Sequence, residues 1–447
     1  MNPHAKEAYK AIVEKCDPLG VFFDYYEGKQ RLTYTLVERL RKIFARWDFR
    51  IVANWCAVVV DACADRIRLD GFAVADDEAA QTKLDQAWRL MALAVESDDV
   101  HEASLVAGEA FLVVWLDPVT GEPTACYNDP RLCYVAYDPE NGRRKLYAAK
   151  LWAVDPKTSR LNLYYADRIE YYEVRGASGI TEIDLQPNPF GVIPVFHFKN
   201  KGSCSDLESV IPLQDGINKL LIDMMVAAEF GAFPQRYVIS GSDTKGLKNE
   251  PGAVWDLAAG DGIGQGTAAG QFEPTQLKNY HEASAQLVST IGAITRTPKH
   301  LFYQGGGDPS GDALIAMEAP LIKKAQDRID RFVPEWRASA RFILQLLGLD
   351  VPLSDIEPVF APCETVQPLA KAQIRKLSVE AGIPLDTAVR EEGWSQSEID
   401  QMHQDAADMA GAQQASLASV LVNAQRGFDQ GPNVPTDYQG PNVTGAP

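Results

Sequence analysis

The chain has 447 residues, of which 46% are hydrophobic and 23% are charged, so it is long enough to bury one large core or several. Its formal net charge of −18 argues against a protein that holds nucleic acid over its whole surface, because such binding depends on neutralising phosphates with Lys and Arg. No stretch reaches the ~18 uninterrupted apolar residues of a membrane span, and the N-terminus has no apolar secretion segment. We therefore expect synthesis in the cytoplasm and no membrane insertion.

The first part of the chain, up to about residue 105, has a helical pattern. Residues 34–47 place their apolar side chains on one helix face, and residues 54–72 fit a helix, or a helix that turns into a strand, ending at Gly71. After Gly108 the pattern changes to strands separated by Asp-Pro, Asn-Gly and Gly turns. The strand segments are 110–116, 131–138, 145–154, 160–167 and 168–174. They predict an antiparallel, meander-like sheet packed on the helices.

The middle of the chain predicts two helices with a short insert between them. The first covers residues 205–231, where Ser205 and Glu208 have capping-box spacing and Pro212 is expected to kink the first turns. Residues 233–241 read as a strand, and residues 257–274 are too rich in glycine to be regular. The second helix covers residues 277–295.

A third helix is predicted to begin with Asp308 as N-cap and Pro309 at its first position, and to run to Gly348 with bends at Pro320 and Pro334. Its length of ~60 Å exceeds what a compact domain needs. A proline-broken connector follows at residues 349–367, and helical patterns return up to residue 425. Residues 426–447 contain QGPNV twice and no core-forming side chains, which predicts a disordered tail.

The glycine-rich segment Gly305–Gly307, which opens the third helix, looks at first like a phosphate-binding loop. A loop of the Walker type requires a Lys and a hydroxyl residue after its final glycine, but Asp312 follows Gly311 here. Asp308 adds a second carboxylate where the phosphate would lie, so we expect no nucleotide at this place. Residues 260–270 fit a dinucleotide fingerprint only loosely, and a flexible loop is the better interpretation.

Metal-binding and catalytic patterns are absent from the sequence. His101-Glu102 and His281-Glu282 begin like a zinc-protease helix, but the second histidine is missing, and we interpret both pairs as polar residues on helix surfaces. The other histidines have no evident partner in sequence, no Gly-x-Ser-x-Gly motif is present, and the seven cysteines include no Cys-x-x-Cys pair. We predict a non-enzymatic protein without metal or cofactor and with reduced cysteines.

The order of these parts resembles the portal (connector) proteins of tailed double-stranded DNA bacteriophages, in their siphovirus branch. The segments that carry the resemblance run in order over most of the chain: YYEGKQ, NWCAVVVDACADRIRLDGF, GEAFLVVW, GVIPVFHFKN, SDLESVIPLQDGINKLLIDMMVAAEFGAFPQRYVISG, RTPKHLF and DPSGDALIAMEAPLIKKAQDRIDRF. Each segment consists mainly of core and turn residues, so the order and spacing make the case.

The resemblance implies an α+β, mainly α subunit of a ring, typically of twelve copies, at one vertex of the virion capsid. It implies a wing at residues 1–204, stem helices at 205–231 and 276–297, and a clip at 232–275. The remaining parts would be a tunnel loop region at 298–307, a long wing helix at 308–348, a connector and crown at 349–425, and the tail at 426–447.

The resemblance also implies residue roles and partners. The tunnel loop beside the DNA would contain Phe302, Tyr303, Gln304, Gly305, Gly306 and Gly307, with Lys299 and His300 lining the channel. Clip contacts would come from Gln235, Arg236, Tyr237 and Trp255. The implied partners are double-stranded DNA in the channel, the terminase packaging motor, the head-to-tail adaptor, the major capsid protein and other copies of the chain. Another oligomeric virion structural protein, or an enzyme of unrecognised class, remains an alternative.

Overall fold

The computed structural model describes residues 2–30, 52–117, 119–176, 179–232, 236–239, 268–273, 275–302, 311–364, 375–391, 399, 401–407 and 409. The chain forms two compact units, residues 1–364 and 365–447. The helices of the first unit are α1 (Pro3–Tyr26), α3 (Trp55–Ala64), α4 (Glu78–Leu90), α5 (Leu93–Ala107), α6 (Ile211–Ala232), α7 (Leu277–Thr295) and α8 (Gly311–Leu346). Its strands are β1 (Leu69–Val74), β2 (Glu109–Leu116), β3 (Pro123–Asn128), β4 (Cys133–Tyr137), β5 (Lys145–Asp155), β6 (Thr158–Tyr164), β7 (Arg168–Arg175), β8 (Gly179–Pro187), β9 (Val195–Lys199), β10 (Arg236–Ile239), β11 (Ala268–Gln271) and β12 (Ile356–Phe360).

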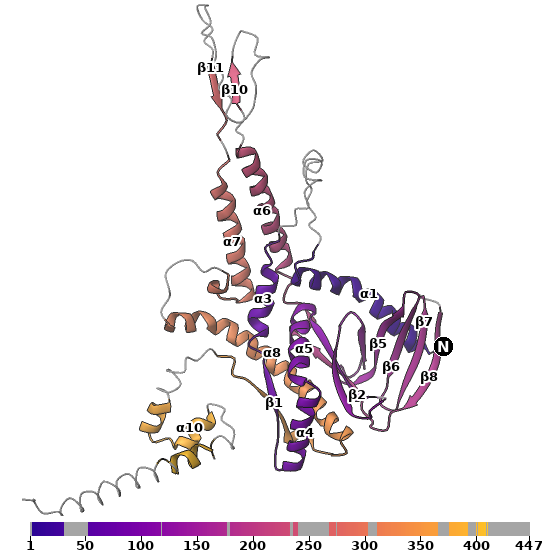
Figure 1. Cartoon of the computed structure of the whole chain (residues 1–447). Coiled ribbons are helices and arrows are strands. Elements are labelled where there is room, and N and C mark those ends of the chain that lie inside the picture. The colour runs from indigo at the N-terminus through magenta and orange to yellow at the C-terminus, as the bar shows by residue number, and fades with distance from the viewer. Residues whose placement is uncertain are drawn as a thin grey trace, which may run out of the picture. The chain divides into compact units, whose positions relative to one another are not determined.

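The predicted mixture of helices and strands is confirmed, and so is the predicted meander for β4 to β7, while β8 was not predicted. Strands β4 to β8 form a five-stranded antiparallel sheet in chain order. Helix α1 covers one face of this sheet, where Ala5, Ala8 and Ile12 pack against apolar side chains that include Tyr147 and Leu161 (Figure 1). Strand β2 lies instead in a separate sheet of order β3-β2-β9, because it pairs with β9 from much later in the chain.

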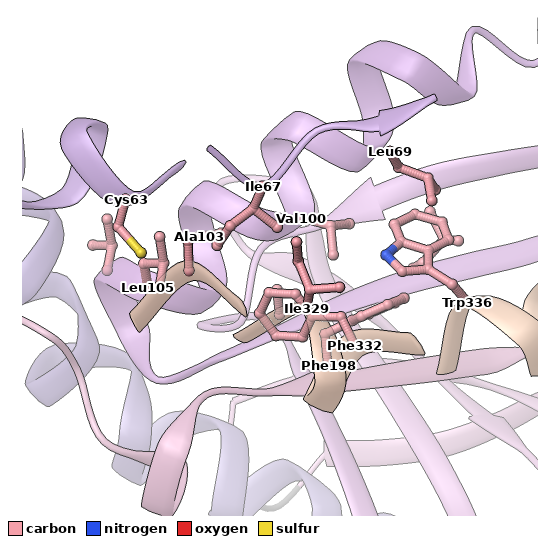
Figure 2. Close-up of a cluster of buried hydrophobic side chains, with 14 of the residues drawn as sticks. Cys63, Ile67, Leu69, Val100, Ala103, Leu105, Phe198, Ile329, Phe332 and Trp336 are labelled. Carbon is pink, nitrogen blue, oxygen red and sulfur yellow. The ribbon is translucent and has the colours of Figure 1, made fainter. Parts of the chain in front are cut away.

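The main core lies between α5, α8 and the β3-β2-β9 sheet. On α8 the buried apolar residues recur at spacings of three or four, a pattern that presents one continuous face to the core; they include Leu321, Ala325, Ile329, Phe332, Trp336, Ala340 and Ile343. Figure 2 shows three of these side chains interleaved with Ile67, Leu69, Val100, Ala103 and Phe198. The core of its own subunit therefore buries the apolar face of this helix over much of its length.

His101 on α5 is buried in this core, so its interpretation as a surface polar residue is wrong. Its Nδ1 lies 2.9 Å from the carbonyl oxygen of Ile67, and its Nε2 accepts a hydrogen bond of 2.9 Å from the indole Nε1 of Trp336. This pattern requires the neutral tautomer with the proton on Nδ1. Burial lowers the pKa of His101 to about 3.

The elements around the two-helix segment differ in detail from the sequence prediction. Helix α6 begins at Ile211, and Ser205 caps a preceding turn by accepting a hydrogen bond of 3.0 Å from the amide of Leu207. Pro212 therefore occupies the first turn of α6, where no amide hydrogen is needed, and does not kink an existing helix. The segment predicted to be irregular ends in strand β11, and α8 is continuous through both of its prolines. Asp308 and Pro309 lie outside the described residues.

Gly108 ends α5 with φ +86°, and a Cβ at this position would lie 2.8 Å from the backbone oxygen of Ser203. We expect Gly108→Ala to lower the melting temperature clearly more than Gly348→Ala. Gly348 follows α8 with φ +79°, and a Cβ at this position would have no other atom within 4 Å. The Gly348→Ala variant therefore has only the backbone strain of a positive φ, about 1–2 kcal/mol. Thermal unfolding of both variants measures the difference, and equal losses would show that the contact with Ser203 is harmless.

The second unit contains α10 (Leu385–Glu391), where Val389 is buried. Nε2 of His403 lies 2.9 Å from a carboxylate oxygen of Asp386. The predicted tail and residues 34–47 lie outside the described residues.

Candidate functional site at the base of the two-helix projection

Helices α6 and α7 pack side by side and project from the core, with the β10–β11 ribbon beyond their ends; we call α6, α7 and this ribbon the two-helix projection (Figure 1). The projection meets the core through α3, where Ile217, Val288 and Ile291 are buried. Gln214 of α6 holds it there, because its Oε1 accepts a hydrogen bond of 3.0 Å from the amide of Trp55.

The ribbon at the end of the projection contains two of the four predicted clip residues. Arg236 pairs with Gln271, and Tyr237 pairs with Gly270 across β10 and β11. A Cβ at Gly270 would lie 2.6 Å from the ring of Tyr237, so the absence of a side chain at Gly270 lets the ring lie over the neighbouring strand. The ring of Phe272 lies 5.2 Å from the same tyrosine. Gln235 and Trp255 lie outside the described residues.

The predicted tunnel loop region follows α7, and the structure describes its first part. Residues Lys299–Leu301 form a turn of 3₁₀ helix, and Phe302 is buried in the main core with its ring 5.6 Å from that of Trp55. Phe302 therefore anchors the start of the predicted loop to the core. The other predicted loop residues, Tyr303–Gly307, lie outside the described residues.

The two predicted channel residues have different surroundings. Lys299 is exposed, whereas His300 is partly buried with Nε2 3.3 Å from a carboxylate oxygen of Glu318 on α8. The second oxygen of Glu318 lies 3.3 Å from Arg66, which follows α3. Glu318 therefore ties the segment after α7 to two parts of the core.

We expect Glu318→Gln to loosen residues 299–302 without unfolding the core. The substitution keeps the size of the side chain but removes the charge that pairs with Arg66 and that Nε2 of His300 contacts. A local loss of ~1 kcal/mol would make amide exchange of this segment about five times faster. Hydrogen exchange with mass spectrometry measures the rate. Glu357→Gln, which breaks the more exposed pair with Arg337, is the control and should leave the segment unchanged.

A second charged cluster lies at the start of the projection and was not found from the sequence. Asp206 is buried, with carboxylate oxygens 2.8 Å from Nζ of Lys324 and 3.1 Å from the guanidinium of Arg328. Asn200 also donates a hydrogen bond of 2.9 Å to it. Burial alone would raise the pKa of Asp206, but the two cations and these hydrogen bonds hold it below its usual value. The feature of the sequence that could have indicated this cluster is the i, i+4 spacing of Lys324 and Arg328 beside the apolar positions of α8.

His197 also has partners that the sequence did not reveal. Its Nε2 lies 2.8 Å from Glu109 and its Nδ1 3.0 Å from the hydroxyl of Tyr137. Burial raises the pKa of Glu109, but His197 and Lys15 more than offset it and hold the pKa at about 2. No group of three His, Cys, Asp or Glu among the described residues could hold a metal ion, and none of the described helices is long and apolar enough to cross a membrane.

Comparisons with known proteins agree on one family. A family model described as phage portal protein, SPP1 Gp6-like, matches residues 14–414. The portal protein of Mycobacterium phage D29 is 24% identical over 441 residues, covering 92% of this chain and 89% of the relative. The portal protein of Mycobacterium phage L5 is 24% identical over 443 residues, covering 89% of this chain and 86% of the relative.

Solved structures similar to the chain include two necks of gene transfer agent particles. A chain from the neck of an empty particle gives a TM-score of 0.46 at 12% identity, covering 79% of this chain and 91% of that chain. A chain from the neck of a native particle gives a TM-score of 0.45 at 14% identity, covering 81% of this chain and 91% of that chain. The family model spans most of the sequence, and the resemblance drawn from the order of its segments is confirmed. The chain therefore belongs to the SPP1 Gp6-like phage portal proteins, which are structural components of the virion.

Proposed function

We propose that this chain is the subunit of a closed portal ring of twelve copies, at one capsid vertex, that forms the channel for DNA packaging and ejection. The family supports the portal role, and the two-helix projection with its terminal β ribbon is the structural observation that carries the assignment. We assign α6 and α7 to the stem, the ribbon to the clip, residues 1–204 and α8 to the wing, and residues 349–425 to the connector and crown.

Exposed apolar side chains on the projection support packing between neighbouring subunits. Met225 on α6 and Leu277 on α7 are 36% and 41% exposed, and Phe272 beside the ribbon is 60% exposed. A ring needs a heterologous interface that closes, and two neighbouring stems would cover such residues.

The ring is tested by measuring mass and by imaging. The wild type should give a mass many times the 49.1 kDa of one chain, and negative-stain images should show a ring with a central channel. The double variant Met225→Lys with Leu277→Lys should assemble poorly. The control is Ile183→Lys, which changes a residue of β8 that is 44% exposed. A wild type that stays monomeric at high concentration would overturn the ring.

We further propose that the clip, including Gln235, Arg236, Tyr237 and Trp255, docks the terminase motor and later the head-to-tail adaptor, with the major capsid protein around the ring. Short strands between two helical arms offer edges for pairing with another chain. Deleting residues 243–255 should abolish motor docking and leave residues 1–204 folded. Motor binding that survives the deletion would refute the clip assignment.

We propose that residues 302–307 are the tunnel loop, with Phe302 as its fixed end and Lys299 and His300 beside the channel. Glycine permits backbone conformations that other residues rarely adopt, which suits a segment that must shift as a duplex passes. Replacing Gly305, Gly306 and Gly307 together with Ala should leave ring assembly nearly intact and reduce the fraction of assembled particles filled with DNA. Normal filling in a stably folded variant would contradict this role, and loss of assembly would show that the glycines serve packing.

A further inference from the structure

A pocket of about 240 Å³ lies where the projection joins the core. Its walls come from four segments: the 3₁₀ turn at residues 201–203, the turn before α6, the end of α7 and the middle of α8. Lys201, Arg296, Lys324 and Arg328 supply its positive charges, and Asp206 and Asp327 its negative charges. The walls therefore carry an excess of two positive charges in a chain whose net charge is −18.

The two carboxylates do not neutralise the pocket. Asp206 already pairs with both buried cations, Lys324 and Arg328. Asp327 lies 2.9 Å from Arg328 and 3.7 Å from Lys201, and no described carboxylate pairs with Arg296. Lys324 has three donor hydrogens, so its contact with Asp206 leaves it able to donate to a second acceptor. Asp206 and Asp327 balance the buried cations Lys324 and Arg328, so the excess positive charge comes from Lys201 and Arg296, which are exposed and available to an anion from solvent.

We propose that this pocket binds a phosphate-type oxyanion, an inference that does not rest on the portal function. Ammonium and guanidinium groups are the donors that bind phosphate oxygens most strongly, and the small polar residue Ser209 also lines the pocket. One water molecule occupies ~30 Å³ in liquid water, so the pocket has room for several water molecules. A hydrated tetrahedral anion therefore fits into it. It is smaller than the ~300 Å³ at which pockets for whole small molecules begin, so a nucleotide is not the expected ligand.

Binding would join parts of the chain that are far apart in sequence. An oxyanion in the pocket would contact the end of α7 through Arg296 and the middle of α8 through Lys324. Because it binds only the folded arrangement, it should stabilise the protein in proportion to its concentration.

The test uses the full chain in its native assembly state and inorganic phosphate as the probe. Phosphate is titrated against sodium chloride at constant ionic strength, and the melting temperature and the ³¹P line width are recorded. The wild type should show a saturable rise in melting temperature and a broadened ³¹P line. The double variant Lys201→Gln with Arg296→Gln changes only two of the pocket's cations and leaves the pairs of Asp206 in place. Its apparent affinity should be at least fivefold weaker.

Lys157→Gln is the control, because Lys157 is an exposed cation in the turn between β5 and β6 and does not line the pocket. It should bind phosphate as the wild type does. A 20-base-pair duplex at the same phosphate concentration distinguishes the source of the phosphate. Stabilisation by the duplex that the double variant loses supports the pocket with DNA phosphates as its ligand. No response of the wild type to either probe, or equal responses of all three proteins, would overturn the proposal.

Discussion

Replacing Asp206 with Asn should lower the free energy of unfolding by about 3–5 kcal/mol, because Lys324 and Arg328 would remain buried without the charge that balances them. Asn keeps the size of the side chain, so the loss reports the charge and not the packing. The control is Asp350→Asn, which breaks an exposed pair with Arg341 near the end of α8 and should leave the melting temperature close to that of the wild type. Comparable melting temperatures for the two variants would contradict the assignment of Asp206 as the balancing charge.

The pH dependence of Asp206 follows from its lowered pKa. A carboxyl whose pKa is lower in the folded state than in the unfolded state stabilises the fold above the unfolded pKa of about 4, and this contribution is lost as the pH falls through the folded pKa. The difference in stability between the wild type and Asp206→Asn should therefore shrink only below about pH 4.

His101 should make the free energy of unfolding depend on pH at a higher pH than Asp206 does. In the folded protein its pKa is about 3, whereas an unfolded histidine takes up a proton near pH 6.5. The unfolded state therefore binds more protons between these values, and stability falls as the pH falls through this window, by up to about 1.4 kcal/mol per pH unit. Protonation of Nε2 would also place an N–H against the indole N–H of Trp336.

The measurement compares the wild type with His101→Gln between pH 7 and pH 4.5. Gln can donate a hydrogen bond to the carbonyl of Ile67 and accept one from Trp336, but it does not titrate. The variant should lose less stability than the wild type over this range, whatever its stability at pH 7. Parallel curves would show that His101 is not the group that titrates.

Much of the fold could be predicted from local patterns. The part of the meander from β4 to β7 is formed by neighbours in sequence, so turn residues and strand composition were sufficient to predict it, whereas β8 was not predicted. The pairing of β1 with β12 and of β2 with β9 joins distant segments, and nothing local specifies such partners. The pattern around His101 shows why the burial of that residue was missed. The polar residue types around His101 suggest an exposed helix face, but Ser97 and Ser104 on the same helix are buried together with it.

The candidate site was predicted in outline only. The sequence placed a glycine-rich segment after α7, but it did not reveal that Glu318 contacts His300 or that Phe302 packs on Trp55. Asp206 and Arg328 are 122 residues apart, and their contact depends on how α8 crosses the start of the projection. Charged residues at helix positions beside the apolar face of α8 were the available signal.

The base of the projection is held to α8 at two places, where the chain enters α6 and where it leaves α7. The turn that leads into α6 contacts α8 through Asp206 and Lys324, and the segment that follows α7 contacts it through His300 and Glu318. Glu318 and Lys324 are six positions apart on one helix, which is about 9 Å along its axis. A sideways load on the β10–β11 ribbon would therefore reach α8 as a torque applied through two separate points, in addition to what passes directly to α3.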